Sequence, residues 1–271
     1  MTGLIVETVR SADGTAIAYE RRGSGPPLLV IGGALTDRRA AADLAEALAP
    51  NLEVLTFDRR GRGASGDTPP YTPDRELEDV AALIGAAGGR AALFGHSSGG
   101  ALALEAARRL GATTVSRLAV YEPPFIVEGS RPPVPIDAIE RLEELVAAGR
   151  RGDAVAYFLV HGPGVPPDAV AEMHTSPGWT AHEAIAHTIA YDLRVMGDAM
   201  RGSRDPLARF TSVTVPTLVI DGGASPSWQH AAADAIAEVM PHARRVTLPG
   251  QGHGAEPAVL APVLASFVAG E

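Results

Sequence analysis

Short apolar runs alternate with helical patterns along most of this chain, and no other feature constrains its fold as strongly. Several of these runs are apolar throughout, which is typical of strands that helices cover on both faces of a parallel sheet. The alternation predicts an α/β fold with right-handed crossovers. We expect strands at Leu4–Arg10, Ala16–Glu20, Leu28–Ile31, Leu52–Asp58, Ala91–Phe94, Arg117–Tyr121, Thr217–Asp221 and Arg244–Leu248. We expect helices between them at Arg38–Leu48, Arg75–Ala87, Gly99–Leu110, Trp228–Met240 and Pro257–Val268.

One long segment, residues 123–206, interrupts this alternation. It is rich in proline and in helical pattern, and it contains no convincing strand. We therefore expect a helical cap inserted into a core that residues 1–122 and 207–271 build. The stretch "EGSRPPVPID" is expected to lead into this cap.

Composition excludes several classes of function. The 271 residues are 46% hydrophobic, enough for one sizeable domain with a buried core. A formal net charge of -9 without a basic cluster argues against nucleic-acid binding and against binding to an anionic membrane. With 0 Cys, a disulfide framework, a thiol nucleophile and a thiolate metal site are all excluded.

The amino-terminal stretch "MTGLIVETVR" lacks the basic and long apolar segments of a signal peptide. No apolar run approaches the roughly 18 residues of a membrane span. We therefore expect a soluble cytoplasmic protein, a monomer or homodimer, whose partner is a small-molecule substrate.

The most informative motif lies where a strand is expected to turn into a helix. Gly95-His96-Ser97-Ser98-Gly99 has the pattern Gly-x-Ser-x-Gly, in which the two glycines allow a tight turn with a strained serine at its apex. Ser97 Oγ would project above the carboxyl end of the sheet as a nucleophile. The Ser98 N–H, at the positive end of the following helix, is placed to bind an oxyanion.

Five stretches in this order resemble the α/β-hydrolase superfamily, and the resemblance spans nearly the whole chain. The stretches are "LLVIGG" (Leu28–Gly33), "FDRRGRGASG" (Phe57–Gly66), "FGHSSGG" (Phe94–Gly100), "PTLVIDGGASP" (Pro216–Pro226) and "LPGQGHG" (Leu248–Gly254). In order, they resemble the oxyanion loop, the loop after the next strand, the nucleophile elbow, the acid-bearing strand and the histidine loop. The resemblance implies an α/β-hydrolase fold with an order of serine, acid and histidine along the chain.

The resemblance assigns the base to His253, which lies in a glycine-rich loop after the last expected strand. His96 is expected to pack or hydrogen-bond locally within the elbow. His230 and His242 flank an expected surface helix, and we expect both to be solvated.

Two patterns that suggest cofactors are rejected. "HEAIAH" (His182–His187) resembles a zinc helix, but a spacing of five residues puts its histidines on different faces. "GRGASG" (Gly61–Gly66) matches a dinucleotide-binding turn, but the prolines of "DTPPYTPD" forbid the helix that should follow directly. We expect no cofactor and no metal site.

The second oxyanion donor is expected in the loop after the third strand. Many members of the superfamily carry His-Gly there, whereas Ile31 precedes Gly32 and Gly33 in this chain. Because the donor is a backbone N–H, any residue can supply it. We assign it to Gly33, with Ala34 as the alternative.

The acid of the triad is ambiguous. Family sequences often place an aspartate where this chain has Ser225, and a serine cannot stabilise an imidazolium as a carboxylate does. Asp221 lies four residues earlier on the same strand, and it could equally form the turn before Gly222. Glu122 ends the preceding strand, a position that some relatives, including certain haloalkane dehalogenases, use for their acid. We favour Glu122, with Asp221 second and an unsupported serine–histidine dyad third.

Together these features predict a serine hydrolase that acts on a small to medium apolar ester, thioester or lactone. Ser97 would form the acyl-enzyme and His253 would act as the base. The same fold also hosts cofactor-free lyases, cyclases and C–C hydrolases, and ligand-binding proteins with a vestigial triad. The sequence leaves these alternatives open, and it does not identify the natural substrate.

Overall fold

A mostly parallel sheet forms the centre of the computed structural model, which describes residues 5–129 and 131–270. Its eight strands have the order β1-β2-β4-β3-β5-β6-β7-β8. β1 and β2 pair antiparallel, β2 also pairs antiparallel with β4, and the pairs from β4 to β8 are parallel. The strands are β1 (Glu7–Arg10), β2 (Ala16–Arg22), β3 (Pro27–Ile31), β4 (Glu53–Phe57), β5 (Ala91–His96), β6 (Val115–Tyr121), β7 (Thr217–Gly222) and β8 (Ala243–Leu248). The predicted fold class is confirmed.

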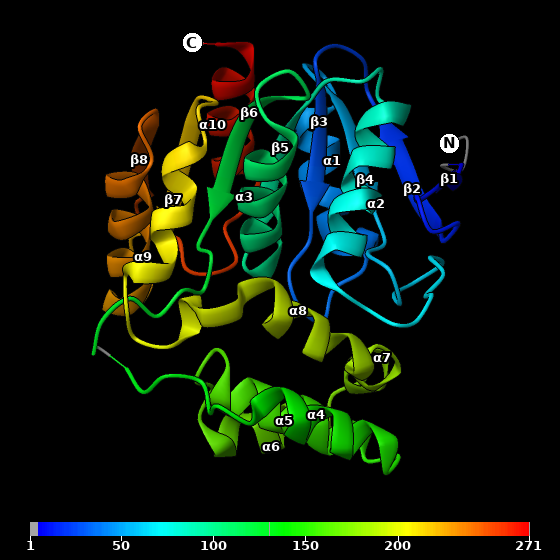
Figure 1. Cartoon of the computed structure of the whole chain (residues 1–271), viewed down its shortest axis with the longest axis vertical. Helices are drawn as coiled ribbons and strands as arrows, with labels where there is room; N and C mark the ends of the chain where they lie inside the picture. The colour runs from blue at the N-terminus through cyan, green and yellow to red at the C-terminus, as the bar shows by residue number, and fades with distance from the viewer. Residues whose placement is uncertain (1–4, 130, 271) are drawn as a thin grey trace.

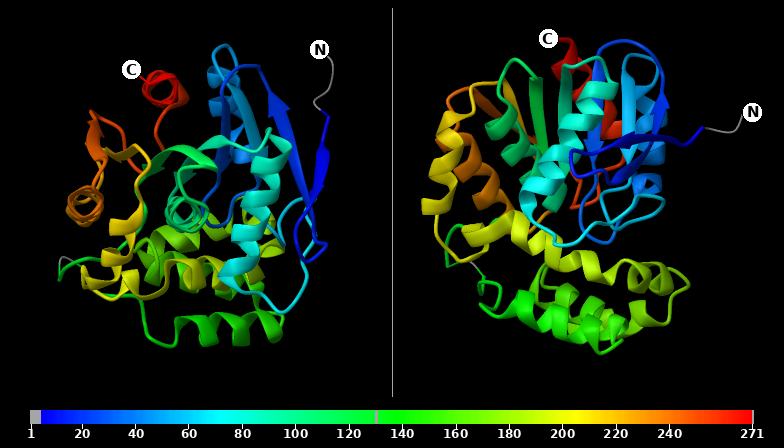
Figure 2. Two further views of the ribbon diagram at one scale, coloured as in Figure 1. Left: turned by 45° about the horizontal axis from the view of Figure 1, so that its top comes forward. Right: turned by 45° about the vertical axis from the view of Figure 1, so that its right-hand side comes forward.

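Helices cover both faces of the sheet, as the left view of Figure 2 shows. Helices are needed on both faces because successive residues of β3 point to opposite faces of the sheet. Leu28 packs in the apolar cluster on one face and Leu29 in the apolar cluster on the other, and both are buried. Each such leucine contributes roughly 1.5–3 kcal/mol through burial. One face carries α2 (Pro73–Ala86), α3 (Ser98–Leu110) and α9 (Ser227–Val239), and the other carries α1 (Ala42–Leu48) and α10 (Pro257–Ala269). The 3-10 helix η1 (Arg38–Ala41) leads into α1.

The chain between β6 and β7 forms a separate helical layer that lies beyond the carboxyl ends of the parallel strands (Figure 1). This helical layer contains α4 (Ala138–Ala147), α5 (Arg151–His161), α6 (Pro167–His174), α7 (Trp179–Ala184) and α8 (Ile189–Met196), with the 3-10 helices η2 (Ala186–Thr188), η3 (Gly197–Met200) and η4 (Asp205–Ser212). The division into a core and a cap at residues 123–206 stays a prediction.

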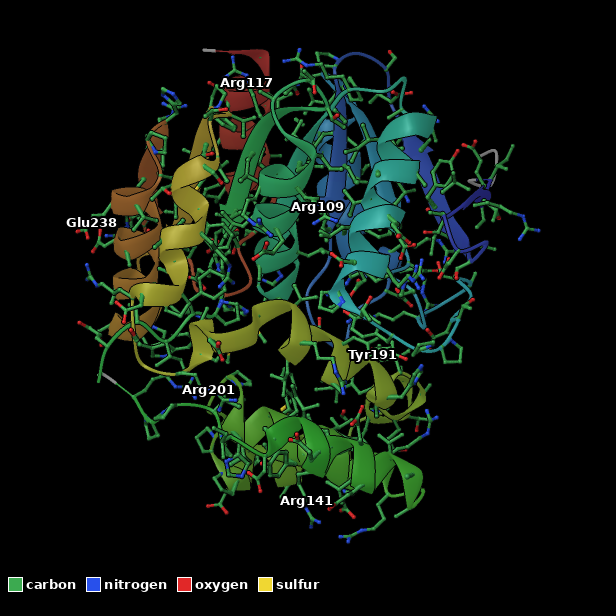
Figure 3. The ribbon with its side chains drawn as sticks, in the orientation of Figure 1. Arg109, Arg117, Arg141, Tyr191, Arg201 and Glu238 are labelled. Atoms are coloured by element: carbon green, nitrogen blue, oxygen red, sulfur yellow. The ribbon has the colours of Figure 1, made fainter. Side chains whose placement is uncertain are left out.

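Helix α8 is the part of the helical layer that contacts the core most closely. Figure 3 shows Tyr191 of α8 on the side facing the core, whereas Arg141 of α4 lies on the outer side of the layer. Tyr191 stacks on Tyr71 with ring centroids 3.7 Å apart, and its hydroxyl donates to Asp67 Oδ2 at 2.9 Å. α8 is therefore fixed against the loop that follows β4.

Among the described residues, no helix is both long and apolar enough to cross a membrane.

Candidate active site

The turn between β5 and α3 has the strained geometry that its sequence predicts. Ser97 has φ 56° and ψ -128°, a conformation that costs a residue other than glycine on the order of 1–3 kcal/mol. A Cβ on Gly95 would lie 2.3 Å from the Gly99 carbonyl oxygen, and one on Gly99 would lie 2.2 Å from that of Ile31. Only glycine therefore fits at either position. The Ser97 N–H donates to the Tyr121 carbonyl at 2.9 Å, which ties the turn to β6.

The loop after β3 lies against this serine. A Cβ on Gly33 would meet Ser97 Cβ at 2.9 Å and Ser97 Oγ at 3.5 Å. Within residues 5–129 and 131–270, the N–H groups of Gly33 and Ala34 donate no hydrogen bond. Ser98 is the first residue of α3, so its N–H lies at the positive end of that helix. The expected oxyanion donors thus gather beside Ser97.

The carboxylate of Glu122 contacts the expected base. Its Oε2 lies 2.7 Å from His253 Nδ1, and its Oε1 accepts from the Gly222 N–H at 2.8 Å. Glu122 also has a positive φ of 46° and is 1% exposed. Burial alone would raise the pKa of this carboxyl, but hydrogen bonds from His253, Ser225 and Gly222 outweigh it and hold the pKa below its usual value. Glu122 is therefore ionised and oriented toward His253.

Asp221, the other candidate acid, belongs to a different cluster. Its carboxylate contacts Arg245 at 2.8 and 2.9 Å, His230 Nδ1 at 2.5 Å and the Thr247 hydroxyl at 3.0 Å. Burial would raise the pKa of Asp221, but these partners, Arg245 first, lower it. His230 is therefore half-buried beside a carboxylate rather than solvated as expected, because β7 and α9 bring the two residues together.

Two side chains near the turn hold the loop of His253. His96 Nε2 lies 2.7 Å from the His253 carbonyl oxygen, and the Tyr121 hydroxyl donates to the Gly252 carbonyl at 2.5 Å. Burial lowers the pKa of His96 to about 4, so this imidazole is neutral at pH 7 and can donate from Nε2. The rings of His96 and His253 are 4.7 Å apart, which places the loop next to the elbow. The side chain of His253 is 41% exposed to solvent.

Sequence reasoning missed Gln229, the third side chain at this pair. It lies 3.1 Å from His253 Nδ1, and in the amide orientation that satisfies both neighbours its nitrogen donates to Glu122. Ser225, which occupies the usual position of the family's acid, instead helps to lower the pKa of the Glu122 carboxyl. The only sequence signal for Gln229 is its spacing, because it follows Ser225, the usual position of the family's acid, by four residues.

A cavity of about 340 Å³ adjoins the site on the side of α1 and α10. Gly33 of the oxyanion loop, His96 of the elbow and Gly254 of the histidine loop all line it. Its other walls are mainly apolar, with Ile31 and Phe94 among them. Ser97, Glu122 and His253 are not among its lining residues, so the cavity lies beside the expected nucleophile rather than around it.

The strained serine, the paired carboxylate and imidazole, and the strand order define the class of α/β hydrolases. A family model described as "Alpha/beta hydrolase family" matches residues 28–263. The chain belongs to this family, and it is an enzyme.

Individual relatives agree with this family. The chain is similar to a crystal structure of an alpha/beta hydrolase from Sphaerobacter thermophilus, with 55% identity, a TM-score of 0.90, and coverage of 96% of this chain and 99% of that one. A hydrolase from Pseudomonas aeruginosa is 25% identical over the full length of both chains, with a TM-score of 0.75. The 2-(acetamidomethylene)succinate hydrolase of Mesorhizobium japonicum is 27% identical over 241 residues, 86% of this chain and 83% of the relative.

Proposed function

We propose that this enzyme is a serine hydrolase that forms an acyl-enzyme on Ser97, with His253 as the base and Glu122 as the acid. The observation that carries the proposal is the 2.7 Å contact between His253 Nδ1 and Glu122 Oε2, beside a strained serine turn. An ionised carboxylate there keeps the proton on Nδ1. Nε2 is then left with the lone pair that can accept a proton from the serine.

In the first half-reaction, Ser97 Oγ attacks the substrate carbonyl carbon while His253 Nε2 takes the hydroxyl proton. The resulting oxyanion is bound by the N–H groups of Gly33 and Ser98, each worth about 3 kcal/mol in comparable sites. The bond from the carbonyl carbon to the leaving oxygen or sulfur then breaks. His253 returns its proton to the leaving group, and the acyl-enzyme remains.

In the second half-reaction, water attacks the acyl carbon and loses a proton to His253 Nε2. The tetrahedral intermediate expels Ser97 Oγ, which recovers the proton from His253. The carboxylic acid leaves, and the free enzyme is restored with no external oxidant, reductant or metal consumed.

The substrates that we propose are small to medium apolar esters, thioesters and lactones. The mainly apolar walls of the 340 Å³ cavity, which adjoins the expected oxyanion loop at Gly33 but does not include Ser97, support an apolar group on one side of the reacting carbonyl. We propose that residues 123–206 act as a cap over the reacting carbonyl. Because one relative is named for the hydrolysis of an acetamido compound, amides belong in the substrate panel as well.

A panel of 4-nitrophenyl esters, a thioester, a lactone and an acetamido compound tests the proposal, with wild type compared with Ser97→Ala. We expect ester or lactone turnover that Ser97→Ala abolishes, and covalent modification of wild type by a fluorophosphonate probe. Modification without turnover would favour a lyase, a cyclase or a binding protein. Absence of both would remove Ser97 from the role of nucleophile.

A further inference from the structure

A cluster of charged side chains is buried between the loop after β4, α2 and α8. Four of its members carry charge and one is polar, and none is more than 2% exposed: Arg59, Arg62, Glu76, Ser98 and Asp192. Two guanidinium groups face two carboxylates, so the cluster is neutral as a whole. None of these side chains takes part in the proton transfers described above.

Asp192 of α8 is the centre of this cluster. Its Oδ1 contacts Arg59 Nη1 at 2.5 Å and accepts from the Ser98 hydroxyl at 2.8 Å, and its Oδ2 contacts Arg62 Nη2 at 2.7 Å. Burial would raise the pKa of Asp192, but the charges of the two arginines outweigh it and keep the carboxyl ionised. Glu76 completes the cluster with two bonds to Arg59, at 2.6 and 2.7 Å.

Both arginines also reach the oxyanion loop. Arg62 Nη1 donates to the Gly33 carbonyl at 2.6 Å, and Arg59 Nη1 lies 3.4 Å from the Gly32 carbonyl. A peptide group is planar and trans, so a bond that fixes its carbonyl also fixes its N–H, which points the opposite way. The Gly32 carbonyl shares a peptide with the Gly33 N–H, and the Gly33 carbonyl shares one with the Ala34 N–H. The arginines therefore set the direction of the expected donor in this loop, Gly33, and of its alternative, Ala34.

The other expected donor, the Ser98 N–H, depends on the same carboxylate. Because the Ser98 hydroxyl donates to Asp192, the first residue of α3 is tied to α8, and its backbone N–H is fixed with it. Asp192 of the helical layer thus connects to both sides of the expected oxyanion position, to the loop of Gly33 through the arginines and to Ser98 directly.

Stability alone gives little reason for this cluster. Burying ions is costly, and well-packed apolar side chains of similar volume often stabilise a protein as well or better. Oxyanion stabilisation, in contrast, requires donors that are oriented before the charge develops. A rigid ionic cluster behind the donors supplies that orientation.

We infer that Asp192 is a positioning residue, which orients the oxyanion donors through Arg59, Arg62 and Ser98. The reaction then depends on the position of α8 against the sheet and its loops. The inference rests on the proposed serine-hydrolase function. It predicts that loss of the carboxylate weakens binding of the transition state more than binding of the substrate.

The chain provides a matched control in the same loop. Arg60 lies between the two arginines of the cluster in sequence, and it forms a buried ion pair with Asp79 at 2.7 and 2.8 Å. Asp79 is 2% exposed and belongs to α2, and its side-chain bonds go to Arg60 rather than to the oxyanion loop. Asp79→Asn therefore makes the same chemical change in an equally buried ion pair.

The experiment compares wild type, Asp192→Asn and Asp79→Asn with the best ester of the panel and with an alkylboronic acid, which mimics the tetrahedral intermediate on a serine. For Asp192→Asn we expect kcat to fall by at least tenfold with KM within about threefold of wild type, and boronate affinity to fall with kcat. For Asp79→Asn we expect a lower melting temperature with kcat and boronate affinity unchanged.

An Asp192→Asn enzyme that is folded and keeps kcat within twofold of wild type would overturn the inference alone. So would an equal loss of kcat in Asp79→Asn. If Asp192→Asn does not fold, Ser98→Ala replaces it, because this variant keeps the backbone N–H and loses only the hydroxyl's contacts to Asp192 and, at 3.5 Å, to Arg59. Since both lost contacts belong to the cluster, we expect kcat to fall about threefold or more, and an unchanged kcat would contradict the inference. A wild-type protein with no turnover and no serine labelling would overturn the proposed function together with the inference.

Discussion

His253 Nδ1 and Glu122 Oε2 lie 2.7 Å apart, although 131 residues separate them in sequence. The fold makes this contact because β6 and the loop after β8 end at the same edge of the sheet. The positive φ of Glu122 and its bond from the Gly222 N–H turn the carboxylate toward the histidine loop. The Glu122–His253 pair therefore has one fixed geometry. We expect that breaking this contact lowers kcat more than it lowers the free energy of unfolding.

Replacing Glu122 with glutamine is the first prediction. The amide removes the charge that stabilises the imidazolium and allows the wrong tautomer of His253. The corresponding change in a Ser-His-Asp protease lowers kcat by about 10⁴-fold, and we expect a loss of at least about 100-fold here. Steady-state ester hydrolysis at pH 7–8 measures it. A Glu122→Gln enzyme with wild-type kcat would exclude this residue as the acid.

Asp221→Asn is the second prediction, and it serves as the counterpart of the first. The change weakens the contacts to Arg245 and His230, which are partly exposed, so we expect a loss of about 1–3 kcal/mol in the free energy of unfolding. Because no bond joins Asp221 to His253 among the described residues, kcat should stay within about threefold of wild type. Urea unfolding and ester kinetics on the same sample separate the two effects. Loss of activity in a folded Asp221→Asn protein would reverse the assignment of the acid.

Gly33→Ala is the third prediction. The new Cβ would lie 2.9 Å from Ser97 Cβ and 3.2 Å from the His96 carbonyl oxygen, so the oxyanion loop or the serine must move. We expect kcat to fall by at least tenfold, since one oxyanion donor is worth about 10²–10³-fold in comparable enzymes. Gly85→Ala is the control, because a Cβ on Gly85 has nothing within 4 Å and α2 tolerates it. Equal kcat in the two variants would argue against a role for Gly33.

The fourth prediction concerns the effect of pH on stability. His96 has a pKa of about 4 in the fold and an ordinary value of 6.5. The unfolded chain therefore binds more protons between these values, and the free energy of unfolding must fall as the pH drops from 6.5 to 4. This one residue accounts for up to about 3 kcal/mol. His96→Gln cannot titrate, so its stability should fall less steeply over the same range in urea unfolding. Parallel curves for wild type and variant would contradict the low pKa.

Local signals in the sequence were sufficient to predict the positions of the strands and of the turn at Ser97. All eight strands and the five flanking helices lie within a few residues of their predicted positions, apart from Leu4, which lies outside the described residues. Apolar periodicity and glycine spacing are properties of adjacent residues, so they can be read from one chain. The strain at Ser97 follows in the same way from Gly95 and Gly99.

Contacts between distant residues could not be predicted in this way. Asp192 meets Arg59 across 133 residues and Arg62 across 130, and no spacing rule links a helix in the segment between β6 and β7 to a loop after β4. Likewise, the choice between Glu122 and Asp221 depended on which carboxylate turns toward His253. That orientation comes from the backbone at Glu122 and from the partners that Arg245 and His230 provide for Asp221.

The proposed mechanism depends most on covalent chemistry at Ser97, and peptide mass spectrometry after rapid acid quench tests this directly. During turnover of a slowly deacylating ester, such as a 4-nitrophenyl pivalate, we predict an acyl group on the peptide that contains Ser97. The adduct should accumulate in His253→Gln far more slowly than in wild type, because the variant lacks the base. Ester turnover with an unmodified Ser97 peptide, or with the acyl group on another residue, would contradict the account.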